Sequence, residues 1–287
     1  MFLTLTFPLT KFINLLLRTF MVHQLSLVST VEHGYYVQTV ATLKALTGLQ
    51  STQNIATYNL VTKPHDVFKP KVEAGKVNQI EQYYMKCITT WDEDTGDIEK
   101  PILKDSNTVE ASRLFVGDNN KRIWTLQISD IPVAGKNQTC SAQTIYDSTL
   151  VHHHTKVVDK VEKENLDQFE FVRNDSFLQF LSDLGYDVIN QFWLKGVRFF
   201  HGDIVIEIFK VFIRDDERQS SDNAIALKLL DESNTFQFKA YINVPKATDV
   251  DAINQGTKEL LKLQDFLKNL VKLEIPDRIH MDSRVSK

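Results

Sequence analysis

The chain has 287 residues, of which 43% are hydrophobic and 10% aromatic, enough to bury the core of one large β-rich domain or two small ones. Its 33 lysines and arginines stand against 37 aspartates and glutamates, so the formal net charge is −4. Proteins that grip nucleic acid through its phosphates carry a basic excess, so we expect no direct contact with nucleic acid. No run approaches the roughly 18 apolar residues that span a bilayer, so no membrane partner is expected. The two cysteines, Cys87 and Cys140, form no CxxC pair and are predicted to be reduced thiols of the nucleus or cytosol.

Residues 1–20 precede the patterned part of the chain. They contain no acid, but proline, lysine, asparagine and arginine interrupt any signal-peptide core, and no Ala-x-Ala site follows. A mitochondrial presequence is the alternative interpretation of this acid-poor composition. We prefer an N-terminal extension outside the fold, with translation starting at Met21 and one β-barrel domain over residues 21–287.

The first elements along the chain are short strands around one helix. Apolar residues of Tyr35–Thr47 recur at helical spacing, and Gly48 stands where a left-handed C-terminal cap belongs. Residues 92–121 carry scattered acids, asparagine and glycine without a sustained period, which predicts a loop insertion. Strands are expected at 22–28, 55–62 and 80–91.

The middle of the chain gives the clearest strand signal. Apolar and polar residues alternate strictly in Trp124–Ser129, which is typical of a half-buried strand, and residues 139–150 are its predicted partner. Residues 152–173 are charged and weakly patterned, which predicts a second loop insertion. Asn174 or Asp175 is the expected cap of a short helix after it.

The C-terminal part predicts a long hairpin and the longest helix. The hairpin arms are 187–200 and 203–213, and a third polar insertion follows at 214–234. Thr248 and Asp251 resemble a capping box at the start of the helix. Many short strands with two or three amphipathic helices indicate an α+β, mainly β fold, an antiparallel β-barrel with flanking amphipathic helices. The other signals are a perfectly alternating strand at 236–244, a helical apolar stripe of Ile253, Leu260, Leu263, Leu267 and Leu270, and a last strand at 271–275.

The sequence offers little that resembles catalytic chemistry. No two glycines have the spacing of a phosphate-binding loop, and neither GxSxG nor HExxH occurs. The run His152-His153-His154 can chelate a metal, but no nearby cysteine or acid completes a site, so we interpret it as a solvated run. Glu207 can be a buried base, or it can pair with Lys210 or Arg198, which we prefer. No catalytic, cofactor or metal site is predicted.

The alternative to a binding protein is a ligand- or phosphate-binding β-barrel hydrolase related to the tunnel triphosphatases. Those enzymes point acids and lysines of alternate strand positions into the barrel. Here Glu207 is followed at the same strand face by Phe209 and Val211, so the barrel lining is predicted to be apolar. An apolar lining fills a core and does not hydrolyse phosphates, so we reject the hydrolase.

Three segments match no local motif, yet their order along the chain is specific. They are MVHQLSLV at 21–28 with HGYYVQTVATLKALTG at 33–48, WTLQISDIPVAG at 124–135, and AYINVPKATDVDAIN at 240–254 with EIPDRIHMDSRV at 274–285. In order and spacing they resemble the Mediator subunit 18 family of yeasts. Residues 1–20 and the histidine run have no counterpart in that resemblance.

The resemblance implies a β-barrel with flanking helices that acts in the nucleus. It implies a non-catalytic subunit of the Mediator head module, which links regulators to RNA polymerase II transcription through protein–protein contacts. The implied partners are Mediator subunit 20, in a heterodimer, the C-terminal helix of Mediator subunit 8, the rest of the head and RNA polymerase II. The C-terminal segment is among the best-matching parts, so we expect it to be docked and to form partner surface through Asp277, Arg278, Asp282 and Arg284.

Overall fold

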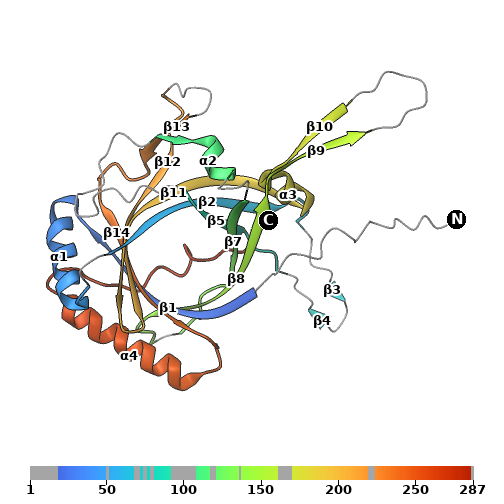
Figure 1. Cartoon of the computed structure of the whole chain (residues 1–287). Helices are drawn as coiled ribbons and strands as arrows, with labels where there is room; N and C mark the ends of the chain where they lie inside the picture. Colours follow the sequence, from blue (N-terminus) through green and yellow to red (C-terminus); the bar gives the residue numbers. More distant parts are fainter. Residues whose placement is uncertain are drawn as a thin grey trace, which may run out of the picture.

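Eight antiparallel strands close into a barrel in the computed structural model (Figure 1). The order around the barrel is β11-β2-β5-β7-β8-β1-β14-β12, and β12 pairs back with β11 to complete the circle. Their bounds are β1 (Thr19–Val31), β2 (Gln53–Pro64), β5 (Met85–Thr90), β7 (Lys121–Ser129), β8 (Ser141–His153), β11 (Tyr186–His201), β12 (Ile204–Arg214) and β14 (Phe236–Val244). The structure describes residues 19–49, 52–67, 72–73, 76–77, 81–91, 108–116, 121–135, 137–160, 170–218 and 224–285.

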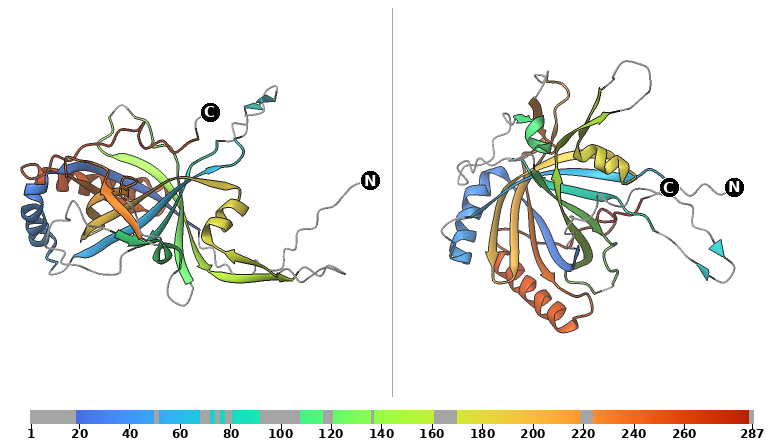
Figure 2. Two further views of the ribbon diagram at one scale, coloured as in Figure 1. Left: turned by 90° about the horizontal axis from the view of Figure 1, so that it is seen from above. Right: turned by 45° about the vertical axis from the view of Figure 1, so that its right-hand side comes forward.

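Helices lie on the outside of this barrel (Figure 2). The larger pair is α1 (Tyr36–Thr47), which follows the short 3₁₀ turn η2 (His33–Tyr35), and α4 (Val250–Leu267). The smaller pair is α2 (Ala111–Phe115) and α3 (Phe177–Asp183). Among the described residues, no helix has the length and apolar character needed to cross a membrane. The remaining strands are β3 (Val72–Glu73), β4 (Lys76–Val77), β6 (Thr108–Glu110), β9 (Thr155–Lys160), β10 (Glu170–Asp175) and β13 (Ala224–Leu229).

The larger hydrophobic core lies between the barrel wall and the helices α1 and α4. Every second residue of β14, from Phe236 to Val244, is buried there, as strict alternation along a strand requires. A Cβ on Gly256 of α4 would lie 3.0 Å from Leu25 of β1, so this helix rests directly on the strands. The helices contribute Tyr36, Val40, Leu43, Leu260, Leu263 and Leu267 to the core.

A second core lies under α2 and α3 and is built from aromatic rings. Trp124 of β7 stacks on Phe177 of α3 with ring centroids 3.8 Å apart. Trp193 of β11 stacks on Tyr58 of β2 at 4.9 Å, and both side chains are at most 1% exposed. Stacked pairs add free energy beyond the area they bury, so this core fixes α3 against the barrel.

The other face of the barrel wall points inward and carries polar and charged side chains among apolar ones. Residues between the buried ones on β14, such as Lys239 and Tyr241, face the interior together with Glu207 of β12 and Arg198 of β11. Lys86 of β5 shares this face. Phe209 and Val211 share this face with Glu207, as the predicted apolar lining requires, but the charged groups of the other strands were not predicted. The more fully apolar face of each strand turns outward to meet the helices.

Gly196 allows the barrel to close. It lies opposite Phe209 in the pairing of β11 with β12, which joins the two ends of the sheet. A Cβ at this position would lie 2.0 Å from the Ile208 carbonyl oxygen and 2.6 Å from the Phe209 Cα. Glycine in a strand marks such a close approach of two backbones.

The three predicted insertions contain more structure than expected. β6 and α2 lie within 92–121, β9 and the start of β10 within 152–173, and β13 within 214–234. These elements are short: β9 and β10 pair with each other, and β13 pairs with its neighbour β12 and with the distant β6. Local periodicity carries no signal for the pairing of β13 with β6.

Several element ends differ from the predictions. β1 begins at Thr19 and pairs with β8 from that residue, so the last two residues of the expected extension belong to the barrel wall, while 1–18 lie outside the described residues. The expected strand at 271–275 is reduced to one bridge between Glu274 and Val28. Gly48 does adopt the left-handed conformation, with φ of 67°, and ends α1 as predicted.

The two predicted helix caps are displaced by one or two residues. Ser176, and neither Asn174 nor Asp175, caps α3 by accepting a hydrogen bond from the Gln179 amide. Asp249 takes the role predicted for Thr248, since its Oδ1 accepts from the Ala252 amide at 3.0 Å. Serine and aspartate are both strong helix caps, so the residue types alone do not predict which of several neighbours caps the helix. The backbone geometry decides it.

Candidate functional site, the docked C-terminal segment

The C-terminal segment, Pro276–Val285, crosses the barrel end and finishes beside the start of β5. The bridge between Glu274 and Val28 directs the chain off β1. Further on, the Tyr84 amide donates to the Ser283 carbonyl and the Val285 amide donates to the Gln82 carbonyl, both at 2.8 Å. Backbone hydrogen bonds at both ends of the segment hold it in one register.

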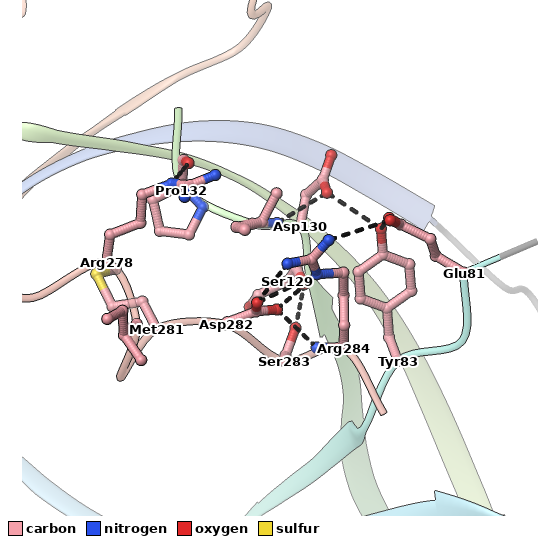
Figure 3. Close-up of polar contacts among 12 residues, drawn as sticks. Glu81, Tyr83, Ser129, Asp130, Pro132, Arg278, Met281, Asp282, Ser283 and Arg284 are labelled. Atoms are coloured by element: carbon pink, nitrogen blue, oxygen red, sulfur yellow. Dashed lines mark hydrogen bonds and ion pairs between the residues drawn. The ribbon is translucent and has the colours of Figure 1, made fainter. Parts of the chain in front are cut away.

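Arg278 holds the first part of this segment against the turn between β7 and β8. Its Nε donates to the Pro132 carbonyl at 2.7 Å (Figure 3). Asp277 folds back on its own chain, where Oδ1 accepts from the Ile279 amide at 2.9 Å. Arg278 therefore contacts the barrel, whereas Asp277 shapes a local turn.

Arg284 is the centre of a charged network at the far end of the segment. Its guanidinium reaches Asp282 at 2.6 Å and Glu81 at 3.1 Å (Figure 3). The hydrogen bonds from Arg284 hold the pKa of the Asp282 carboxyl below its usual range. Carboxylates on both sides raise the pKa of the Arg284 guanidinium, so it stays charged at any accessible pH.

Tyr83 links this network to the C-terminal end of strand β7. Its hydroxyl lies 2.9 Å from Glu81 and 3.2 Å from Asp130, and Asp130 in turn accepts from the Ile131 amide at 2.8 Å. Burial, and then the two acidic neighbours, raises the pKa of Tyr83, so the phenol stays protonated and remains a donor. The Ser283 hydroxyl also donates to the Ser129 carbonyl.

The middle of the segment contacts residues of β8 that face the barrel interior. The Nε2 group of Gln143 donates to the Met281 carbonyl at 3.2 Å and to the Asp130 carbonyl at 2.8 Å. The hydroxyl of Ser141 lies 3.5 Å from the Met281 sulfur. Gln143 and Ser141 are both buried, so the segment covers the inner edge of the barrel at this end.

The structure brings only part of the predicted set together. Asp282 and Arg284 form one network, Arg278 contacts a separate carbonyl, and Asp277 stands apart from both. Sequence reasoning missed Glu81, which meets Arg284 across 203 positions. No local pattern connects residues so far apart.

The outer edge of the segment stays exposed. Ile279 is 78% exposed, and the His280 side chain is 85% exposed. The charged groups are thus used within the chain, while an apolar and an aromatic side chain remain on the surface.

The structure also shows the surroundings of Glu207 and of the histidine run, the two candidates for chemistry in the sequence. Glu207 pairs with Arg198, whose Nε and Nη2 lie 2.7 and 2.6 Å from Glu207 Oε1, as preferred from the sequence. His152 is only 7% exposed and meets the edge of Phe177 at 5.8 Å, so the interpretation of the run as solvated is wrong for this residue. His153 on the opposite face is exposed. No cluster of three or more metal-ligating side chains occurs within the described ranges.

Comparison with known proteins gives this arrangement a family. Residues 23–284 match the family described as Med18 protein. The protein named Mediator of RNA polymerase II transcription subunit 18 in Debaryomyces hansenii is 56% identical, and the match covers 93% of this chain and 99% of the relative. The proteins of the same name in Scheffersomyces stipitis and Candida albicans are 52% and 46% identical, each over 92% of this chain and 99% of the relative.

The fold has a counterpart among solved structures. A chain in the structure of the Schizosaccharomyces pombe Mediator head module aligns with a TM-score of 0.55 at 13% identity, covering 88% of this chain and 98% of that one. At this identity the likeness concerns the fold alone, and it agrees with the β-barrel described above. The family match over nearly the whole described chain, and relatives matched almost end to end, show that this protein belongs to the Mediator subunit 18 family.

Proposed function

We propose that this chain is a non-catalytic subunit of the Mediator head module, which links gene-specific regulators to RNA polymerase II transcription through protein–protein contacts in the nucleus. The observation that carries the proposal is the 56% identity to a named Mediator subunit 18 across 99% of that relative. Identity at this level supports the same fold and the same role for this chain.

The polar interior is consistent with a structural role. Glu207, the candidate base, accepts two hydrogen bonds from Arg198 and a third from the Tyr241 hydroxyl at 3.2 Å. These contacts join strands β11, β12 and β14, so Glu207 and its neighbours support the barrel wall.

The proposed partners are Mediator subunit 20 and the C-terminal helix of Mediator subunit 8, with the rest of the head and RNA polymerase II beyond them. The C-terminal segment with Asp277, Arg278, Asp282 and Arg284 is the proposed partner surface. Ile279 and His280 support it, since their exposed side chains stand on a backbone held rigid from both ends. A preorganised surface loses little entropy on binding.

A groove offers a second surface for a helical partner. It has a volume of about 450 Å³ and lies between α1, α4 and the turn from β11 to β12. Leu46, Leu263 and Phe266 give it apolar walls, and Phe266 is 61% exposed. Glu259 and Lys262 at the rim provide charges of both signs, as expected where an amphipathic helix lies in a groove.

Reconstitution tests this proposal. The full chain is co-expressed with Mediator subunit 20 and the C-terminal part of subunit 8 from the same organism, and the mixture is separated by size-exclusion chromatography with mass detection. We expect one complex with all three components. Elution of a folded chain apart from both partners contradicts the proposal.

A further inference from the structure

The barrel interior contains a cluster of charged side chains contributed by five strands. We call it the inner cluster and define it as Lys86, Asp147, Arg198, Glu207 and Lys239. The strand registers place all five on the inner face, since Arg198 lies opposite Glu207, Glu207 opposite Lys239, and Lys86 and Asp147 both opposite Gln127.

Internal pairing satisfies this cluster unevenly. Arg198 and Glu207 form a close ion pair, with 2.6 Å between Nη2 and Oε1. Lys239 donates to a neutral amide oxygen, Gln24 Oε1, at 2.7 Å and lies over the Tyr241 ring at 4.9 Å from its centroid, while Asp147 accepts from the Gln127 amide at 3.0 Å. Lys86 makes no direct hydrogen bond or close ion pair with any described residue, and its electrostatic partner is Asp147. Three cations against two carboxylates leave one positive charge in excess.

The two lysines approach each other from opposite walls. β5, which carries Lys86, and β14, which carries Lys239, lie four places apart in either direction around the barrel. The Lys86 ammonium is close enough to Lys239 to contribute to lowering its pKa, although burial is the larger cause and Glu207 opposes it. Two like charges that face each other across an enclosed space repel unless an anion lies between them.

The two lysines are only partly buried. Desolvation lowers the pKa of both ammonium groups. Both residues nevertheless keep solvent-accessible surface, unlike the fully buried residues on the outer face of the same strands, so they are not sealed off from water.

We propose that the inner cluster binds a small oxyanion of the phosphate type between the ammonium groups of Lys86 and Lys239. Such an anion accepts several hydrogen bonds at once, and the lysines offer charged donors from two sides. The proposal involves no hydrolysis and is independent of the role in Mediator. The oxyanion neutralises the surplus charge and couples opposite walls of the barrel.

Calorimetric titration of the full-length chain with inorganic phosphate tests the site. Sodium chloride holds the ionic strength constant, because phosphate also stabilises folded proteins in general. We expect saturable binding of one phosphate per chain. Lys86→Met and Lys239→Met should each weaken it by about tenfold, the effect of losing one charged hydrogen-bond donor. Lys246→Met, which changes an exposed lysine just after β14, should leave the affinity unchanged.

Both lysine variants are expected to fold, because methionine keeps the length of the side chain and removes a charge that is costly to bury. Thermal unfolding without phosphate confirms that each variant is folded before titration. Absence of saturable binding to the wild type overturns the proposal. Equal phosphate affinity in the folded double variant K86M/K239M and the wild type overturns it as well.

Discussion

The two faces of the same barrel wall have opposite characters. On β14 the outward residue Phe238 is 1% exposed and packs in the core beneath the helices, whereas its neighbour Lys239 points inward to the amide of Gln24. The outer face is dry and apolar and carries the hydrophobic stabilisation. The inner face carries charged and polar groups among apolar ones, and most of those charged groups have hydrogen-bond partners in the wall. In this protein the hydrophobic core lies outside the barrel.

The test with the largest expected effect compares adjacent residues of one strand. Phe238→Ala should lower the free energy of unfolding by about 4 kcal/mol, because it leaves a cavity in the outer core. Gln237→Ala, one position away on the inner face, should change it by less than about 0.5 kcal/mol. Urea unfolding followed by circular dichroism measures both. Equal losses would show that the two faces contribute alike.

Gly196→Ala tests closure of the wall. The added methyl group meets the Ile208 carbonyl oxygen and the Phe209 Cα, so the two strands must move apart. We expect a loss of about 2 kcal/mol in the free energy of unfolding, in the range of other overpacked sites. Gly34→Ala is the control, since nothing lies within 4 Å of a Cβ there. An unchanged free energy of unfolding in Gly196→Ala would mean that β11 and β12 are not closely packed at this position.

His152→Ala should have a moderate effect, in contrast to its neighbour. It removes a buried ring that packs against the edge of Phe177, so about 1 kcal/mol of stability should be lost. His153→Ala changes an exposed side chain on the other face and should stay within about 0.5 kcal/mol. Thermal unfolding with and without a chelator measures both. A chelator effect in the wild type alone would indicate a metal bound by the histidines.

Reversing the charge of Arg284 should release the C-terminal segment while the rest of the barrel stays folded. In Arg284→Glu three carboxylates meet at Glu81 and Asp282, and they repel each other. Hydrogen exchange of the Tyr84 and Val285 amides, which bond across this contact, should accelerate by about tenfold or more. The control is Lys268→Glu at the C-terminal cap of α4, where the ion pair with Asp265 is local. Unchanged exchange of both amides would show that the ion pairs do not hold the segment.

The same variant also probes the proposed partner surface. If the segment forms that surface, Arg278→Glu and Arg284→Glu should weaken assembly with the neighbouring subunits by about tenfold or more, as loss of a hot-spot residue does. Calorimetry on the co-expressed subunits measures this affinity. Full affinity in a variant whose segment is released would remove the segment from the interface.

The last prediction is a pH dependence that arises on the inner face. Burial lowers the pKa of Lys239 to about 8 from 10.5, so between these pH values the unfolded chain binds more protons than the folded one. Stability from this residue therefore rises with pH across that window, by at most about 1.4 kcal/mol per pH unit. Lys239→Met should reduce the slope measured between pH 7.5 and 9.5, whereas Lys246→Met should not. An identical slope in wild type and Lys239→Met would show that burial does not lower the pKa of Lys239.

The sequence predicted what depends on neighbouring residues. Alternation located β14 to the residue, and helical spacing located the buried stripe of α4, including Leu260 and Leu263. Alternation placed Phe209 and Val211 on the face of Glu207, but it cannot say which residues of other strands line the barrel beside them, so the charged part of the lining was not predicted. Lys210 illustrates the same limit. It occupies an outward position of β12 at 1% exposure, where its distant partners include His33, Asn234 and the ring of Phe236.

The candidate site was predictable only in outline. The charged pattern and the family resemblance indicated a docked C-terminal segment, and hydrogen bonds do hold it against the barrel at Gln82, Tyr84 and Pro132. The partners of its charges could not be inferred, since Glu81 and Pro132 come from parts of the chain that meet the segment only in the folded barrel. Its role as a partner surface stays a prediction.

Affinity purification of the endogenous chain from nuclear extract, with quantitative mass spectrometry, tests the central claim most directly. A subunit that works through protein–protein contacts should retain its assembly after purification. We expect the other Mediator head subunits, including subunits 20 and 8, in amounts comparable to the chain itself, with RNA polymerase II present at lower abundance. Recovery of the chain without any Mediator subunit would contradict the account.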